Sequence, residues 1–247
     1  MAAHTGPDLV QEGIIVHIDA ANSKSYPGSG TTASDISGGT AYNGTLSGGP
    51  TFSTDNGLAV WRFDGSDDRL DVTDPTWPLQ SISYPFTIES AIYVPAGVDW
   101  WNDPASGSSS GSAIVGRGSY SGSLGFLRNG TTDIRFWIRP HSIGRSVTYT
   151  AAFDRWYILS GTFDGTQNAN GMVFYVNGVS VGSTTVSDSL ANFDADSYTL
   201  GGNVNFGGSE LGGYVQGDIP YFRLYNRALS QNEVLQNFNA TRGRFGL

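Results

Sequence analysis

The chain has 247 residues, of which 38% are hydrophobic and 13% aromatic, enough for a sizeable core and more than a disordered chain carries. Its formal net charge of -9 removes the attraction to phosphates on which nucleic-acid binding depends, so we expect no nucleic-acid partner. The absence of cysteine excludes disulfides, thiolate metal sites and cysteine nucleophiles. No apolar run reaches the roughly 18 residues of a membrane span, so we expect no membrane partner.

Strand-like runs follow one another at short intervals along most of the chain. Alternation is clearest in 86–94, where one face carries Phe86, Ile88, Ser90, Ile92 and Val94. Asn177 and Gly178 separate two apolar runs and predict a tight hairpin, because both residues tolerate positive φ. The other predicted strands are 13–20, 59–64, 69–72, 112–117, 124–129, 133–139, 145–150, 155–163, 171–178, 198–202 and 214–225. This pattern predicts an all-β sandwich of two antiparallel sheets, in a single domain spanning 1–247.

Two stretches, 21–50 and 95–111, are rich in small and polar residues and predict long surface loops. The second contains two adjacent tryptophans flanked by aspartates. Aromatic faces stack on sugar rings or fill pockets of a protein partner. We therefore assign ligand or partner contact to Asp99, Trp100, Trp101 and Asp103. The alternative is that the tryptophans only pin the loop to the sandwich.

The end of the chain carries the signals of one short helix. Ser230 and Glu233 have the spacing of a capping box, and Leu229 and Val234 have the spacing of a hydrophobic staple. These signals predict a helix over 230–242. Such a short helix is marginal by itself in water, so we expect it to dock on the sandwich.

We expect the docked face of this helix to be an apolar stripe formed by Val234, Leu235 and Phe238. Replacing Phe238 by alanine would then cost on the order of 3 kcal/mol. The residues after the helix include two arginines and an aromatic ring. We assign a contact with a neighbouring subunit to Arg242, Arg244 and Phe245.

Few residues are candidates for catalysis. The histidines show no Ser/His/Asp spacing, and His17 lies inside a predicted strand, which favours a structural role. Glycoside hydrolysis needs two carboxylates across the sugar bond, and Glu89 has no second acid two or four positions further along its strand. We therefore expect a protein that is not an enzyme.

An acidic turn is the better candidate for a metal site. Its carboxylates are Asp64, Asp67, Asp68, Asp71 and Asp74, and calcium takes several such oxygens. The spacing is not that of an EF-hand loop. The alternative is a solvated turn in which the aspartates cap their own backbone. For calcium, the first ligands that we assign lie at or near strand ends: Asp19, Asp64 and Asp218.

Several motifs in order resemble the laminin G-like branch of the concanavalin A-like lectin/glucanase superfamily. They run from about residue 9 to 245 and include "GIIVHIDAANSKSYPGSGT", "FDGSDDRL", "FTIESAIYV", "YVNG" and "GDIPYFRLYNRALSQNEVLQNF". The resemblance implies a jelly-roll sandwich whose last strand, 218–225, lies beside 14–18. It also implies glycan or protein binding at the loop rim or concave face, and calcium in some members. The hydrolase branch carries E-x-D-x-x-E, whereas 89–94 lacks the second and third acids.

The closing sequence "VLQNFNATRGRFGL" resembles structural proteins of tailed bacteriophages, especially those of marine bacteria and cyanobacteria. Our leading hypothesis is a virion protein that decorates the capsid or an appendage and displays a lectin-like docking module. Its partners would be other virion proteins, a second copy of itself or a cell-surface glycan. The first residues lack a secretory signal, which fits release by lysis. The alternatives are a lectin whose main task is glycan recognition and a glycoside hydrolase.

Overall fold

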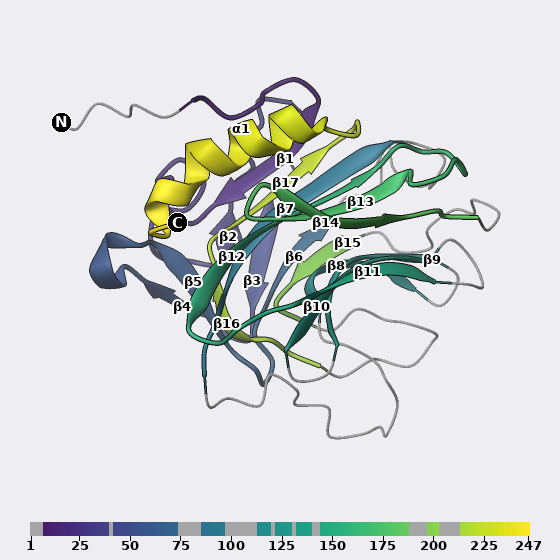
Figure 1. The fold of residues 1–247 in the computed structure, drawn as a ribbon. Helices are drawn as coiled ribbons and strands as arrows, with labels where there is room; N and C mark the ends of the chain where they lie inside the picture. Colours follow the sequence, from purple (N-terminus) through teal and green to yellow (C-terminus); the bar gives the residue numbers. More distant parts are fainter. Residues whose placement is uncertain are drawn as a thin grey trace.

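The computed structural model describes residues 7–39, 42–73, 85–96, 113–119, 122–129, 132–139, 144–187, 197–202 and 213–247. In these ranges two antiparallel sheets pack face to face, and one helix lies on the outer face of one of them (Figure 1). This confirms the predicted jelly-roll sandwich with a short C-terminal helix. No helix in the described ranges is long and apolar enough to cross a membrane.

The sheet under the helix, here the helix-side sheet, has nine strands within the described residues. Along it run β14 (Val179–Thr184), β13 (Met172–Val176), β12 (Arg155–Phe163), β7 (Phe86–Val94), β16 (Gln216–Ile219), β5 (Val60–Asp64) and β4 (Thr51–Ser53). β17 (Tyr221–Tyr225) also pairs with β7, and β1 (Ile14–Asp19) pairs with β17. The first and last strands are therefore neighbours, as the family resemblance implied.

The second sheet has eight strands within the described residues. Their order is β11 (Arg145–Thr150), β10 (Asp133–Arg139), β9 (Gly122–Asn129), β8 (Ala113–Ser119), β15 (Ser197–Leu200), β6 (Arg69–Thr73), β3 (Gly44–Ser47) and β2 (Thr32–Ala33). The core between the two sheets is apolar and includes Trp61, Phe63, Phe126, Phe136 and Phe174, all fully buried. Each such side chain stabilises the fold by about 1.5–3 kcal/mol relative to exposure.

Local signals in the sequence predicted the alternation and the hairpin correctly. The apolar residues on the predicted face of β7 lie in the core, namely Phe86, Ile88, Ile92 and Val94. Asn177 and Gly178 form the turn between β13 and β14 with φ of 52° and 76°. A Cβ atom at Gly178 would lie 2.9 Å from the Phe238 ring, so this turn also permits close approach of the helix.

Two expectations about strands were wrong in detail. The stretch 21–50 contains β2 and β3, and β4 follows at once. The sequence did not predict these strands, because runs of two to four residues are too short to show alternation. The predicted last strand, 218–225, is divided at Pro220, which has no N–H for a ladder hydrogen bond. Before the proline the chain pairs with β5, and after it the chain pairs with β1.

The helix α1 (Gln231–Thr241) begins where the capping box predicted. Ser230 Oγ accepts a hydrogen bond from the Glu233 backbone N–H, and the Glu233 carboxylate accepts one from the Ser230 N–H. Leu229 and Val234 pack in one buried cluster with Tyr175 and Tyr225, among others. Two short 3-10 turns, η1 (Asp55–Gly57) and η2 (Arg242–Arg244), complete the helical elements of the described ranges.

The predicted apolar stripe on α1 was only partly right. Val234 is buried, but Leu235 is 42% exposed and Phe238 is only partly buried. The helix instead buries the polar residues Asn237 and Thr241. The reason is the charged residues that lie beneath it on the sheet, described below.

Candidate functional site

The helix covers one end of the helix-side sheet and leaves the part over β4, β5 and β16 uncovered (Figure 1). Two depressions of about 430 and 470 Å³ lie there. Arg62, Tyr93 and Asp218 line both depressions, so the two adjoin. Together we call them the sheet groove. Their volumes lie in the range of small-molecule sites, about 300–1,000 Å³.

Aromatic side chains form one wall of the groove. Tyr93 on β7 and Trp156 on β12 are cross-strand partners, and their ring centroids lie 5.5 Å apart. The Phe245 ring also packs on Trp156, with 4.6 Å between the ring centroids. Burial and the neighbouring Asp154 carboxylate raise the pKa of Tyr93. Tyr93 and Trp156 are partly exposed, so each presents ring surface to solvent.

A paired arginine crosses the groove between its two depressions. Arg62 Nε and Nη2 donate to the two Asp218 carboxylate oxygens at 2.9 and 3.2 Å, and Nη1 donates to Asp55 at 3.3 Å. The hydrogen bond to Asp218 is the main cause that raises the pKa of Arg62. A guanidinium has five N–H donors. Contacts with described residues use three of them, which leaves one N–H on each of Nη1 and Nη2 for a ligand.

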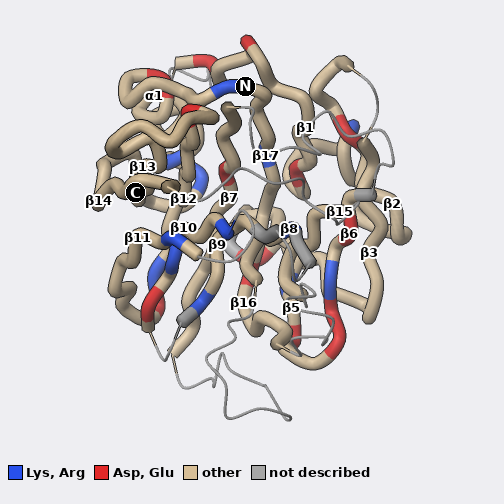
Figure 2. Tube along the Cα trace, turned by 90° about the vertical axis from the view of Figure 1, so that its right-hand side faces the viewer, with Lys and Arg blue, Asp and Glu red and all other residues tan. Residues whose placement is uncertain are grey.

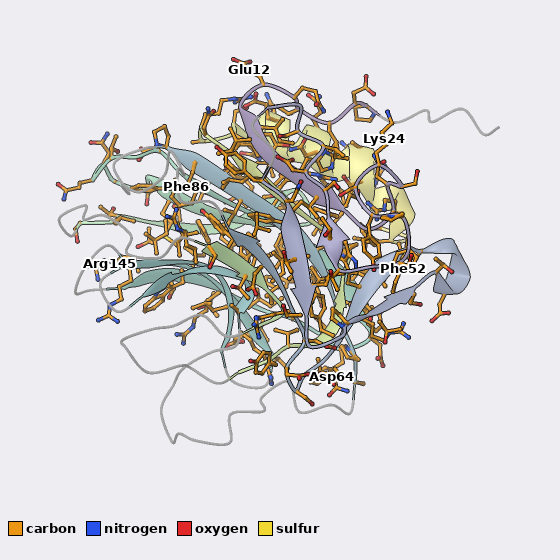
Figure 3. The ribbon with its side chains drawn as sticks, turned by 180° about the vertical axis from the view of Figure 1, so that it is seen from behind. Glu12, Lys24, Phe52, Asp64, Phe86 and Arg145 are labelled. Atoms are coloured by element: carbon orange, nitrogen blue, oxygen red, sulfur yellow. The ribbon has the colours of Figure 1, made fainter. Side chains whose placement is uncertain are left out.

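Acidic residues gather at the end of the groove that lies away from α1. The carboxylate oxygens of Asp64, Asp67 and Asp68 lie within 4.8 Å of one another. Figure 3 shows Asp64 at this end of the sandwich, and Figure 2 shows the turn after β5 in red. Burial first, and then the charges of Asp64 and Asp67, raise the pKa of Asp68. Oxygen ligands of this kind suit a hard cation such as calcium.

The three predicted calcium ligands do not come together. Only Asp64 belongs to the acidic cluster of the described residues. Asp218 is held by Arg62, and the Asp19 carboxylate accepts from Arg244 Nη1 at 2.8 Å. Each of these two carboxylates therefore has an arginine partner. The strand-end signal identified these acids but not the arginines that face them.

The residues predicted for a subunit contact pack largely within the chain. Phe245 is buried against Trp156 and Tyr221, and Arg244 is ion-paired with Asp19. These contacts hold Arg244 and Phe245 on the sheet of their own chain, and a subunit contact at either residue stays a prediction. Arg242 is exposed, and a subunit contact there stays a prediction.

A buried ionic network lies under α1. Glu89 on β7 and Arg223 on β17 are 1% and 2% exposed, with 3.7 Å between Arg223 Nη1 and Glu89 Oε2. Glu89 also accepts from Ser160 Oγ and Asn237 Nδ2, both at 2.9 Å. Arg223 Nη1 donates to Thr241 Oγ1 at 3.4 Å. Buried charges need such partners, which explains why the helix buries polar side chains.

This network also includes Glu89, the one residue considered as a catalytic acid for glycoside hydrolysis. Burial raises the pKa of Glu89, as it does for catalytic acids, but α1 covers the carboxyl group. A polysaccharide therefore cannot reach Glu89 in this structure. Burial and then Arg223 lower the pKa of His17 to about 4, so this side chain is neutral at pH 7.

The predicted contact residues Asp99, Trp100, Trp101 and Asp103 lie outside the described residues, so their role stays a prediction. Sequence reasoning missed the groove residues Arg62, Tyr93 and Trp156. A signal existed for the aromatic pair, because Tyr93 and Trp156 occupy the outward positions of strands whose alternate residues are apolar. No local signal could have matched Arg62 with Asp218, since 156 positions separate them.

A laminin G-type family model, described as the concanavalin A-like lectin/glucanases superfamily, matches residues 64–235. A comparison with curated proteins gives no match. Solved structures share the fold. The receptor-binding domain of botulinum neurotoxin C/D mosaic serotype has a TM-score of 0.68 at 14% identity, over 94% of this chain and 52% of that one.

Two further structures are similar. Botulinum neurotoxin type C, whose cell entry is described as dependent on interaction with two ganglioside molecules, has a TM-score of 0.64 at 16% identity, over 93% of this chain and 52% of that one. The binding domain of botulinum neurotoxin DC in complex with rat synaptotagmin II has a TM-score of 0.66 at 15% identity, over 94% and 52%. The chain thus spans about half the length of these structures. With a family match over well more than half of its residues, the chain belongs to the concanavalin A-like lectin/glucanase superfamily.

Proposed function

We propose that the protein is a lectin-like binding module without enzymatic activity, and that its sheet groove recognises a glycan. The observation that carries this proposal is the partly exposed Tyr93–Trp156 pair beside the Arg62–Asp218 ion pair. Aromatic rings pack on the apolar faces of sugars. The arginine offers N–H donors and the carboxylate offers acceptors to sugar hydroxyls.

The similar toxin domains support a binding task. Their descriptions name receptor binding, gangliosides and synaptotagmin. The fold alone does not transfer those partners to this chain, because one fold hosts many functions. The choice of a glycan over a protein partner rests on the groove: both of its depressions are small, and their lining mixes aromatic and ionic groups.

Binding to a glycan panel tests the proposal. Trp156→Ala removes one stacking surface, and we expect roughly a tenfold loss of affinity for any bound glycan. The matched control is Trp137→Ala, which removes a partly exposed tryptophan from β10 in the second sheet and should leave binding unchanged. Thermal melts show that both variants are folded. Absence of glycan binding, or equal losses in the two variants, contradicts the groove as the site.

We also propose a setting for this module, as a decorating or appendage protein of a bacteriophage virion. The support is the resemblance of the closing sequence, 234–247, to such proteins. An antibody to the protein should label the heads or the tails of intact particles. Failure to find the protein in purified particles would remove this setting without touching the groove.

A further inference from the structure

We infer that the sheet groove selects uncharged oligosaccharides and rejects those that carry a carboxylate or a sulfate. The inference rests on the proposed glycan-binding function and names its ligand class. It comes from the charges that line the groove within the described residues. These are two arginines against four aspartates: Arg62, Arg244, Asp55, Asp64, Asp68 and Asp218.

Both arginines already have carboxylate partners. Arg62 makes two hydrogen bonds to Asp218 and a third to Asp55, and Arg244 is ion-paired with Asp19 at 2.8 Å. An acidic sugar would have to compete with these carboxylates for the same cations. Neither arginine therefore offers an uncompensated positive charge to an anionic ligand.

Among the residues that the structure describes, no arginine or lysine pairs with the carboxylates at the far end of the groove. Asp64 Oδ1 accepts from the Ser66 backbone N–H at 2.7 Å, and Asp68 Oδ2 accepts from the Asp64 N–H at 2.9 Å. Asp67 adds a third carboxylate within 4.8 Å. Three carboxylates so close together repel an anionic ligand, and the repulsion extends over about 8–10 Å at physiological ionic strength.

The same groups suit the hydroxyls of an uncharged sugar. Each hydroxyl can donate and accept one hydrogen bond at once. The two remaining N–H groups of Arg62 can donate to neighbouring hydroxyls, while the Asp218 and Asp55 oxygens can accept from them. Trp156 and Tyr93 line the same depression, and their rings can pack against the apolar face of the sugar ring.

The test compares matched pairs of oligosaccharides that differ by one charged group: with and without a terminal sialic acid, and with and without a sulfate. Affinities are measured by calorimetry in the presence of a chelator, so that no metal ion screens the acidic cluster. The uncharged member of each pair should bind roughly tenfold tighter or more. This preference should shrink between about 50 mM and 500 mM salt, because salt screens the repulsion.

Asp64→Asn removes one of the repelling charges and should reduce the preference. The matched control is Asp133→Asn on β10 of the second sheet, which changes the net charge equally and should leave the preference intact. Acidic members that bind equally well or better, in a manner sensitive to Trp156→Ala, overturn the charge inference and leave glycan binding in the groove standing. Binding that ignores Trp156→Ala, or no binding at all, overturns both.

Discussion

Replacing Asn237 by leucine removes the amide that joins three segments of the chain beneath α1. Asn237 Oδ1 accepts from the Val10 backbone N–H at 2.8 Å. Its Nδ2 donates to Glu89 Oε2 at 2.9 Å and to the Tyr225 hydroxyl at 3.0 Å. Asn237 is 2% exposed, so water does not replace these hydrogen bonds in the variant.

The expected cost follows from the groups that lose a partner. A buried donor or acceptor left without a hydrogen bond costs about 1–3 kcal/mol, and a charged one costs more. The Val10 N–H loses its acceptor, and the Glu89 carboxylate loses one of its donors but keeps Ser160. The Tyr225 hydroxyl keeps its bond to the Val10 carbonyl. We expect a loss of about 3 kcal/mol from an unfolding free energy of about 5–15 kcal/mol.

Urea unfolding, followed by tryptophan fluorescence and circular dichroism, measures this loss. With a slope of about 2–3 kcal/mol per molar urea, the midpoint should fall by about 1 M. Asn239→Leu is the control, because Asn239 lies on the same helix but is partly exposed, and its effect should stay within about 0.5 kcal/mol. If Asn237→Leu shifts the midpoint no more than the control does, the polar network does not hold the helix on the sheet.

Three more measurements address other parts of the molecule. Because burial lowers the pKa of His17 to about 4 in the folded chain, the unfolded chain binds the extra proton between about pH 6.5 and 4. As the pH is lowered through this window, the stability of the folded chain should therefore decrease. His17→Gln should make the melting temperature decrease less steeply with falling pH, and equal pH dependence in the variant and the original protein contradicts the reasoning. Phe238→Ala should cost about 1–2 kcal/mol in urea, below the value for a fully buried ring, since Phe238 is partly exposed; a loss near 4 kcal/mol would show a tighter contact. If Asp64, Asp67 and Asp68 hold calcium, a chelator should lower the melting temperature, and identical melts in chelator and in millimolar calcium count against the site.

The parts of the fold that could be predicted from sequence depend on neighbouring residues. Ser230 and Glu233 are three positions apart, and their capping box is present. Asn177 and Gly178 are adjacent and form the hairpin turn. The alternation along 86–94 also correctly assigned its apolar residues to the core.

The helix face and the groove depend instead on residues far apart in sequence. By residue type, Leu235 would be expected in the core and Asn237 at the surface. The reverse arrangement depends on Glu89, which lies beneath the helix and is 148 positions from Asn237 in the sequence. The groove combines strands β4, β5, β7, β12 and β16 with the end of the chain. A sequence pattern within one segment contains no information on such pairs, which explains why both the buried network and the Arg62–Asp218 pair were missed.

The pairing of β17 between β1 and β7 also affects how the protein is made. In the part of the chain that the structure describes, β1 pairs only with β17, β5 pairs with β16, and β7 pairs with both β16 and β17. Until the ribosome has synthesised residues 216–225, β1 therefore has no partner in this sheet, β5 lacks one neighbour and β7 lacks two. Open strand edges are templates for pairing with other chains, and pairs so distant in sequence form slowly. A chain cut before residue 216 should therefore aggregate instead of losing only its helix. The helix-side sheet is thus completed only after residues 216–225 have been synthesised, and its strand edges stay open to association until then.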